Sequence, residues 1–401
     1  MGSGIATSFL VTGHSVVLLE VSQDALDAAV KRIQSVLNSS VKKGKMTDEQ
    51  RDQALARLCP TLDYGSFAQV NLAMEAVIED IALKQKIFKQ LEEVLPRDAI
   101  LATNTSTIPL DTVSSQIEDQ SRVVGTHYFS PAHFMPLLEI IRFEKTSPQV
   151  LLDVIALAKA SRKTPVVVGN CPGFAVNRMF AFYDMAAWML TDGGVDPYKL
   201  DEAVLAFGMP MGPYRMFDMA GVDVLVFALD ILDKAFRDRS YSTDFTRLLV
   251  AAGRKGDKTG AGLYTLEGRD AKQDYAAINS ILAESRKRAA AKHPFLQGSP
   301  MSKLSPEEMV EMVMLPAVNE GCRIVEEGHV ARASDLDVAS VMAMGFPATR
   351  GGIMHWADSL GSTAICDKLD RWADVYGPLF KPCGLLRDTA KTGGLLSASR
   401  V

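Results

Sequence analysis

The first 170 residues alternate short apolar runs with longer stretches of helical periodicity, and this alternation restricts the fold more than any other feature. The runs have the length of strands and lack the strict polar alternation of a half-exposed sheet. Such strands are typical of a parallel sheet covered by helices on both faces, so we predict an α/β domain over residues 1–169. The predicted strands lie within HSVVLLE (14–20), AQVNLAMEAVI (68–78), AILATN (99–104), RVVGTHYF (122–129), LLEIIRF (137–143) and TPVVVG (164–169).

Helical signals separate these runs and dominate the remainder of the chain. Apolar spacing predicts helices over residues 24–38 and 80–94. Ser147-Pro148 is a typical helix start, because serine caps the first amides and proline fits the first helical position. Ser305-Pro306 predicts another helix start, with Glu308 in the position that completes a capping box.

The second half of the chain contains an internal repeat. FGMPMGPYRMFDMAG (207–221) matches MGFPATRGGIMHWADSLG (344–361), and the segments before them, LDEAVLA (200–206) and LDVASVMA (336–343), match as well. A repeat that includes both a turn and the helix before it predicts two related all-α domains, over residues 170–300 and 301–401. The paired positions are Pro210 with Pro347, Arg215 with Gly352 or its neighbour, Asp218 with Asp358, and Gly221 with Gly361; the polar residues 253–304 are predicted to form a long connection with some helix.

Composition narrows the classes of function. The net charge of −5 gives no global basic field, so we predict no nucleic-acid partner. No uncharged apolar run approaches the length of about 18 residues that a membrane span needs. The five cysteines are scattered without a CxxC pair, a pattern that favours free thiols and argues against a structural metal site. The final residues Ser399, Arg400 and Val401 resemble a relaxed peroxisomal address.

Two features near the start of the chain fit a nucleotide. Gly2 lies at the opening of a predicted helix, where a glycine lets backbone amides approach a pyrophosphate. Glu20 ends the strand that follows, where dinucleotide-binding folds place an acid on the adenosine ribose. The alternative interpretation is a general strand-to-helix turn with a surface glutamate.

Four polar residues at strand ends or at the junction after residue 169 are candidates for chemistry. His127 is a candidate general base, and Glu139 is a candidate carboxylate to orient its ring. Ser106 and Asn177 offer a hydroxyl and an amide for a substrate oxygen. Taken singly, each has an ordinary alternative: a core histidine, a solvated glutamate, or helix caps.

Taken together, these residues identify a family. The chain resembles the 3-hydroxyacyl-CoA dehydrogenases, within them the C-terminal half of plant-type peroxisomal multifunctional β-oxidation proteins, over essentially its whole length. The resemblance implies oxidation of (S)-3-hydroxyacyl-CoA to 3-oxoacyl-CoA with NAD as the cofactor. The matching segments are MGSGIA, EAVIED (75–80), NTST, THYFSPAHFMPLLEI, KTPVVVGNCPGFAVNR (163–178), FGMPMGP and GFPATRGGIMHWAD.

The resemblance also implies roles for individual residues. His127 is the expected general base, oriented by Glu139, with Ser106 and Asn177 at the substrate oxygen. Lys43 is expected to contact the CoA phosphates, with Lys42 and Lys45 nearby, although a solvated basic helix end explains these lysines equally well. The expected cofactor-binding residues are Gly2, Glu20, Ala76, Glu79, Lys84 and Asn104.

The chain departs from the family at its start. Relatives have a strand and a glycine-rich turn before MGSGIA, so we expect a Rossmann-like domain without its first strand and a weakened hold on NAD. A competing hypothesis is therefore a truncated, non-catalytic remnant that acts as a subunit or binds CoA esters. A third hypothesis is a different β-hydroxyacid or sugar-nucleotide dehydrogenase, which the Ser-His-Glu-Asn spacing disfavours. We expect a monomer or dimer, in the peroxisome or alternatively the cytoplasm.

Overall fold

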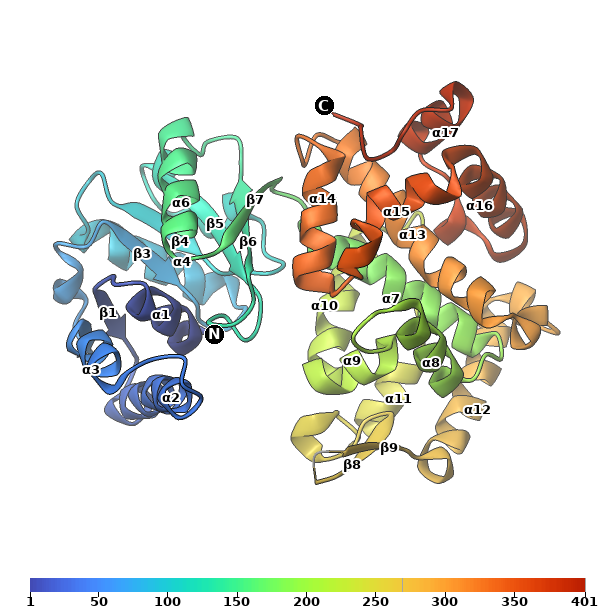
Figure 1. Cartoon of the computed structure of the whole chain (residues 1–401), viewed down its shortest axis with the longest axis horizontal. Helices are drawn as coiled ribbons and strands as arrows, with labels where there is room; N and C mark the ends of the chain where they lie inside the picture. Colours follow the sequence, from blue (N-terminus) through green and yellow to red (C-terminus); the bar gives the residue numbers. More distant parts are fainter. Residues whose placement is uncertain (269, 401) are drawn as a thin grey trace. The chain divides into compact units, whose positions relative to one another are not determined.

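The structure, a computed structural model, describes residues 1–268 and 270–400 and separates into two compact units, Met1–Phe174 and Ala175–Val401 (Figure 1). The first unit combines strands and helices as predicted, and the second is mainly helical. The division of the helical part into two domains at residue 300 stays a prediction, because the second unit is compact as a whole.

The elements of the first unit follow the predicted alternation. Their bounds are α1 Gly2–Val11, β1 Val16–Leu19, α2 Gln23–Lys42, α3 Asp48–Ala56, β2 Leu58–Thr61, β3 Leu72–Glu75, α4 Ile81–Val94, β4 Ile100–Thr103, α5 Leu110–Val113, β5 Val123–Tyr128, β6 Leu137–Arg142, α6 Pro148–Ala160 and β7 Thr164–Gly169. Each of the six predicted apolar runs contains a strand. Ser147 caps α6 as expected, because its hydroxyl accepts a hydrogen bond from the Val150 amide.

Five of these strands form one sheet in the order β3-β4-β5-β6-β7. The parallel arrangement that the sequence predicts is found in β3, β4 and β5, and again between β6 and β7. Between β5 and β6, however, the pairing is antiparallel. The connection there, residues 129–136, is too short for the crossover of a dozen or more residues that a parallel pair needs.

β1 and β2 form a separate parallel ladder. Among the residues that the structure describes, no strand bonds to the second edge of β1 or of β3. The four apolar residues of β1 are accordingly only half-buried, whereas all of β4 is buried.

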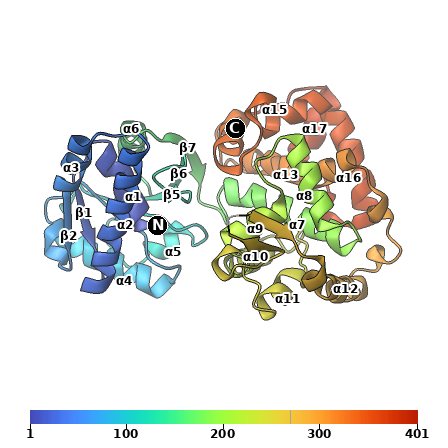
Figure 2. The ribbon, with the colours of Figure 1, turned by 60° about the horizontal axis from the view of Figure 1, so that its bottom comes forward.

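Helix α1 packs against both ladders. Its Ile5 belongs to the apolar cluster formed by β4, β5, β6 and α6, and its Ala6 and Leu10 belong to the cluster around α2, α3 and β1. Figure 2 shows α1 and α2 side by side. Side-chain packing on this helix therefore helps to connect the two sheets.

The second unit is built around two long buried helices. Their bounds, with those of the elements around them, are α7 Val176–Asp192, α8 Pro197–Phe207, α9 Pro213–Ala220, α10 Val222–Ala235, α11 Phe245–Ala251, β8 Tyr264–Glu267, β9 Asp270–Gln273, α12 Tyr275–Lys292, α13 Pro306–Glu326, α14 Ala333–Ala339, α15 Ile353–Leu360, α16 Ser362–Tyr376 and α17 Gly384–Thr392. α7 and α13 pack against each other, and most of the residues of each helix are buried. Ser305 and Glu308 form the predicted capping box of α13.

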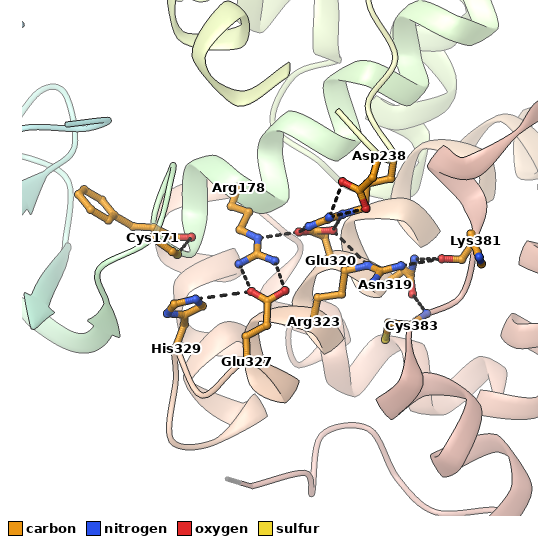
Figure 3. A network of polar contacts seen from close by, with 12 residues as sticks. Cys171, Arg178, Asp238, Asn319, Glu320, Arg323, Glu327, His329, Lys381 and Cys383 are labelled. Carbon is orange, nitrogen blue, oxygen red and sulfur yellow. Dashed lines mark hydrogen bonds and ion pairs between the residues drawn. The ribbon is translucent and has the colours of Figure 1, made fainter. Parts of the chain in front are cut away.

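A buried ionic network joins these two helices (Figure 3). The Arg178 guanidinium of α7 is 1% exposed and donates to Glu320 at 2.6 Å and to Glu327 at 2.6 and 2.9 Å. Arg239 also donates to Glu320, at 2.9 and 3.1 Å. Buried charges are tolerated only when they are paired in this way, so the network fixes the relative position of α7 and α13.

The internal repeat is visible in the hydrogen bonds of the second unit. Asp201 of α8 accepts the amides of Tyr214 and Arg215, and Asp337 of α14 accepts the amides of Met354 and His355. In both copies an aspartate thus caps the start of the following helix, α9 or α15. His355, three residues beyond Gly352, is therefore the structural counterpart of Arg215.

Candidate active site

The candidate residues of the first unit gather where three neighbouring parallel strands end. Ala76 and Glu79 follow β3, Asn104 and Ser106 follow β4, and His127 lies near the end of β5. The carboxyl ends of parallel strands meet at one edge of a sheet, where α/β proteins bind their ligands. Together with Glu139 of β6, these five residues make six positions, separated in the sequence, that lie at one edge of the sheet.

His127 and Glu139 form a hydrogen-bonded pair across the antiparallel ladder. The two residues are register partners of β5 and β6, and directly opposed side chains of such a ladder contact each other. His127 Nδ1 lies 2.7 Å from Glu139 Oε2, and both side chains are buried. Since Nδ1 faces the carboxylate, any partner other than Glu139 would have to use Nε2.

Aromatic rings enclose the imidazole. The ring of Phe129 lies 4.5 Å from that of His127, and the ring of Phe174 lies 5.7 Å away, centroid to centroid. Asn104 Oδ1 accepts the backbone amide of Tyr128 at 2.9 Å, which joins the loop after β4 to the strand that carries His127. The histidine is therefore held on three sides by packing and by its carboxylate.

Glu79 organises the loop that carries Ser106. Its carboxylate accepts the Ser106 amide at 2.7 Å, the Ser106 hydroxyl at 3.2 Å, and the Thr105 hydroxyl at 3.0 and 3.1 Å. The sequence interpretation assigned Glu79 to the cofactor and Ser106 to the substrate, without a contact between them. In the fold they are direct neighbours.

A buried ion pair that contacts Glu79 was not anticipated from the sequence. The Lys84 ammonium, 1% exposed, lies 2.8 and 3.0 Å from the two carboxylate oxygens of Glu75 and 3.4 Å from Glu79. The Thr103 hydroxyl also donates to Glu75, at 2.7 Å. A signal was present, because Glu75 ends an otherwise apolar strand, where an unpaired charge is costly.

Three further residues proposed for a dinucleotide, Gly2, Glu20 and Ala76, are in positions that fit one. Gly2 opens α1, and a side chain added there meets no atom within 4 Å, so a phosphate has room to approach the first amides. Glu20 directly follows β1 and is partly exposed. Ala76, partly buried, begins the loop after β3. The arrangement matches the acid, helix start and strand ends of a dinucleotide site.

Two further predicted residues lie at helix ends. Lys43 is exposed at the C-terminal end of α2, with Lys42 and Lys45 beside it, where positive charge also favours the helix dipole. Asn177 lies in the first turn of α7, in the second unit, and is partly exposed. Cys171 is buried, and its thiol donates to the carbonyl of Phe174.

An α/β unit with a nucleotide-type edge and a buried His-Glu pair has the features of an NAD-dependent oxidoreductase. Residues 1–171 match the NAD-binding domain of 3-hydroxyacyl-CoA dehydrogenase, and residues 173–266 match the C-terminal domain of that enzyme. A 3-hydroxybutyryl-CoA dehydrogenase of Ralstonia eutropha is 34% identical, with a TM-score of 0.63 over 67% of this chain and 95% of that one. The chain belongs to the 3-hydroxyacyl-CoA dehydrogenase family.

Other relatives align with nearly the whole length of this chain. The glyoxysomal fatty acid beta-oxidation multifunctional protein of Brassica napus is 45% identical over 99% of this chain, and the peroxisomal one of Oryza sativa is 46% identical over the same share. The chain spans about half, 54%, of the length of each of these plant proteins. The 3-hydroxybutyryl-CoA dehydrogenase of Escherichia coli K12 superposes with a TM-score of 0.83 at 28% identity, over 98% of this chain and 96% of that one.

Two kinds of feature are absent from the described residues, 1–268 and 270–400. Within them, no three His, Cys, Asp or Glu side chains are grouped so as to hold a metal ion. In the same part of the chain, none of the helices combines the length and apolarity that crossing a membrane demands.

The Glu79→Ala substitution is expected to loosen the Ser106 loop. It removes the acceptor for two hydroxyls and one amide, so the free energy of unfolding should fall by about 1–3 kcal/mol. Urea denaturation measures this loss, and hydrogen exchange of the Ser106 amide should accelerate with it. Glu93→Ala, an exposed glutamate on α4, is the matched control. A Ser106 amide that exchanges at the original rate in Glu79→Ala would contradict the role of Glu79 in holding the Ser106 loop.

Proposed function

We propose that this chain oxidises (S)-3-hydroxyacyl-CoA to 3-oxoacyl-CoA with NAD⁺, as a step of fatty-acid β-oxidation. The observation that carries the proposal is the His127–Glu139 pair, 2.7 Å apart, at the strand-end edge of an NAD-binding domain. Alcohol oxidation needs a proton acceptor beside the hydride acceptor, and a carboxylate-held imidazole is suited to that task. NAD supplies the hydride acceptor when it is bound.

The residue roles are part of the same proposal. His127 takes the proton of the substrate 3-hydroxyl at Nε2, while Glu139 at Nδ1 holds the ring and stabilises its charged form. Ser106 and Asn177 contact the substrate oxygen. Phe129 and Phe174 keep water away from the ring, which favours proton transfer to the base over loss to solvent.

The cofactor would be held along the same edge. Glu20 accepts the hydroxyls of the adenosine ribose, and the amides that follow Gly2 face the pyrophosphate. The remaining proposed cofactor residues are Ala76, Glu79, Lys84 and Asn104. Of these, Glu79 and Lys84 belong to the nicotinamide-ribose side, where the buried Lys84 would act through Glu79. Whether the chain works as a monomer or a dimer stays a prediction.

The first test is turnover of acetoacetyl-CoA with NADH, followed through the absorbance of NADH. We expect activity in the unaltered chain and a loss of about 100- to 10,000-fold in kcat for His127→Ala. In this reduction the imidazole donates the proton that it accepts in the oxidation, and general acid–base catalysis contributes by that factor. His14→Gln, a histidine outside the site, is the matched control. No turnover in a folded chain would instead support the non-catalytic remnant that binds CoA esters.

The Lys43 proposal predicts an effect on CoA substrates alone. For Lys43→Glu we expect KM for acetoacetyl-CoA to rise by about fivefold, because a charge-assisted contact to phosphate is replaced by repulsion. The Kd for NADH and kcat should stay unchanged, and added salt should reduce the difference. Lys89→Glu, an exposed lysine on α4, controls for net charge. Equal KM values for both variants would return Lys43 to the role of a solvated helix end.

We also propose that the chain works in the peroxisome. The support is the resemblance to proteins named glyoxysomal or peroxisomal, together with the Ser399-Arg400-Val401 tripeptide, of which Val401 lies outside the described residues. A fluorescent protein fused before Met1 is expected to coincide with a peroxisomal marker and to become diffuse when the tripeptide is deleted. Diffuse signal from the full chain would favour the cytoplasm.

A further inference from the structure

Glu75 is a buried carboxylate with a hydrogen-bond donor for each of its lone pairs. Oε1 accepts from Lys84 Nζ at 2.8 Å and from the Val77 amide at 2.6 Å. Oε2 accepts from Lys84 Nζ at 3.0 Å and from the Thr103 hydroxyl at 2.7 Å. The residue is 3% exposed, so no ligand is expected to contact it. Its influence on a ligand must pass through its partners.

Lys84 is shared between two carboxylates unequally. Its ammonium contacts Glu75 at 2.8 Å and Glu79 at 3.4 Å, and its side chain is 1% exposed. The closer pair with Glu75 neutralises the lysine, and Glu79 keeps most of its capacity to accept hydrogen bonds. Glu79 uses that capacity on the Ser106 loop, through the Ser106 amide and hydroxyl and the Thr105 hydroxyl.

We propose that Glu75 is a positioning residue for the dehydrogenase reaction, which acts through Lys84 to keep Glu79 on the Ser106 loop and to set the charge beside the nicotinamide ring. Without the Glu75 charge, Glu79 is the one carboxylate among the described residues that still pairs with Lys84. The ammonium then draws Glu79 away from Ser106. The inference rests on the proposed function, because it assigns the nicotinamide side of the cofactor to this edge.

The charge of the cluster distinguishes the two forms of the coenzyme. Two carboxylates and one ammonium leave a formal charge of −1 on Glu75, Glu79 and Lys84. The oxidised nicotinamide ring carries a positive charge and the reduced ring carries none. A net negative cluster therefore favours NAD⁺ over NADH, and the ratio of the two dissociation constants reports its charge.

The experiment is a charge series on the full chain. Glu75→Gln makes the cluster neutral, Lys84→Met makes it doubly negative, and the double variant restores the original charge without the ion pair. Fluorescence titration gives Kd for NAD⁺ and for NADH, and acetoacetyl-CoA reduction gives kcat. Glu93→Gln, exposed on α4, controls for the loss of a carboxylate. Thr103→Val removes one hydrogen bond from Glu75 and leaves its charge.

The proposal predicts a pattern in two readouts. Relative to the unaltered chain, the ratio Kd(NAD⁺)/Kd(NADH) should rise by about three- to tenfold in Glu75→Gln, fall in Lys84→Met, and return in the double variant. Thr103→Val should leave the ratio unchanged. The kcat of Glu75→Gln should fall by about tenfold, and the double variant should be no slower than Lys84→Met, because Glu75 acts through the lysine.

Two results would overturn the proposal. The first is a Glu75→Gln chain with a lower melting temperature but an unchanged Kd ratio and kcat, since this is the behaviour of a structural residue. The second is a double variant whose loss of kcat equals the product of the single losses, since Glu75 would then act independently of Lys84. If Glu75→Gln does not fold, the ratio Kd(NAD⁺)/Kd(NADH) is compared between the double variant and Lys84→Met. A higher ratio in the double variant supports the proposal, and equal ratios overturn it.

Failure of the proposed function gives a different result. An unaltered chain that binds NADH but does not reduce acetoacetyl-CoA rejects the proposed reaction, while the Kd ratios across the charge series still decide the role of Glu75. An unaltered chain that turns over normally, with the same Kd ratio in every variant, rejects the role of Glu75 alone. A chain that binds neither coenzyme rejects both.

Discussion

The antiparallel register of β5 and β6 is the constraint on which the candidate site depends. It places His127 directly opposite Glu139, so the pairing of the two side chains is set by backbone hydrogen bonds and not by flexible loops. A slip of one residue would turn the carboxylate to the other face of the sheet. The reversal of the chain at residues 129–136 is what makes this opposition possible, and β7 then pairs in parallel with β6.

The loops that follow β3 and β4 are organised by charges that are buried and almost fully hydrogen-bonded. An ion pair such as Lys84 with Glu75 gives little net stability, because the attraction mainly offsets the loss of hydration. Its effect is to define one arrangement of the strand-end loops. The Arg178–Glu320 pair does the same for helices of the second unit.

The sequence predicted the local features of the fold well. The apolar strands and the caps at Ser147 and Ser305 were found because these signals lie within a few neighbouring residues. β2 was missed because its sequence, LCPT, is short, largely exposed and contains Pro60. Proline argues against a central strand but is tolerated in an edge strand. The β8–β9 hairpin was missed because its residues are polar. The reversal at β6 was missed because apolar runs do not reveal strand direction.

For the site, sequence reasoning found the residue types but not their contacts. His127 and Glu139 were proposed as a pair because a carboxylate can orient an imidazole, and the structure brings the two side chains into contact. Glu75 escaped notice because its partner, Lys84, lies nine residues further along and meets it only through the fold. The role of Asn177 in the second unit stays a prediction.

Helix α1 gives the first unit an unusual kind of cohesion. The two ladders share no backbone hydrogen bonds among the described residues, so their alignment depends on side-chain packing, and α1 contributes apolar side chains to the cluster of each ladder. The same helix presents Gly2 to the proposed pyrophosphate position. Ligand occupancy and sheet alignment are therefore thermodynamically linked. A coenzyme that binds only the aligned state stabilises the domain, and the gain in the free energy of unfolding grows with the logarithm of the coenzyme concentration.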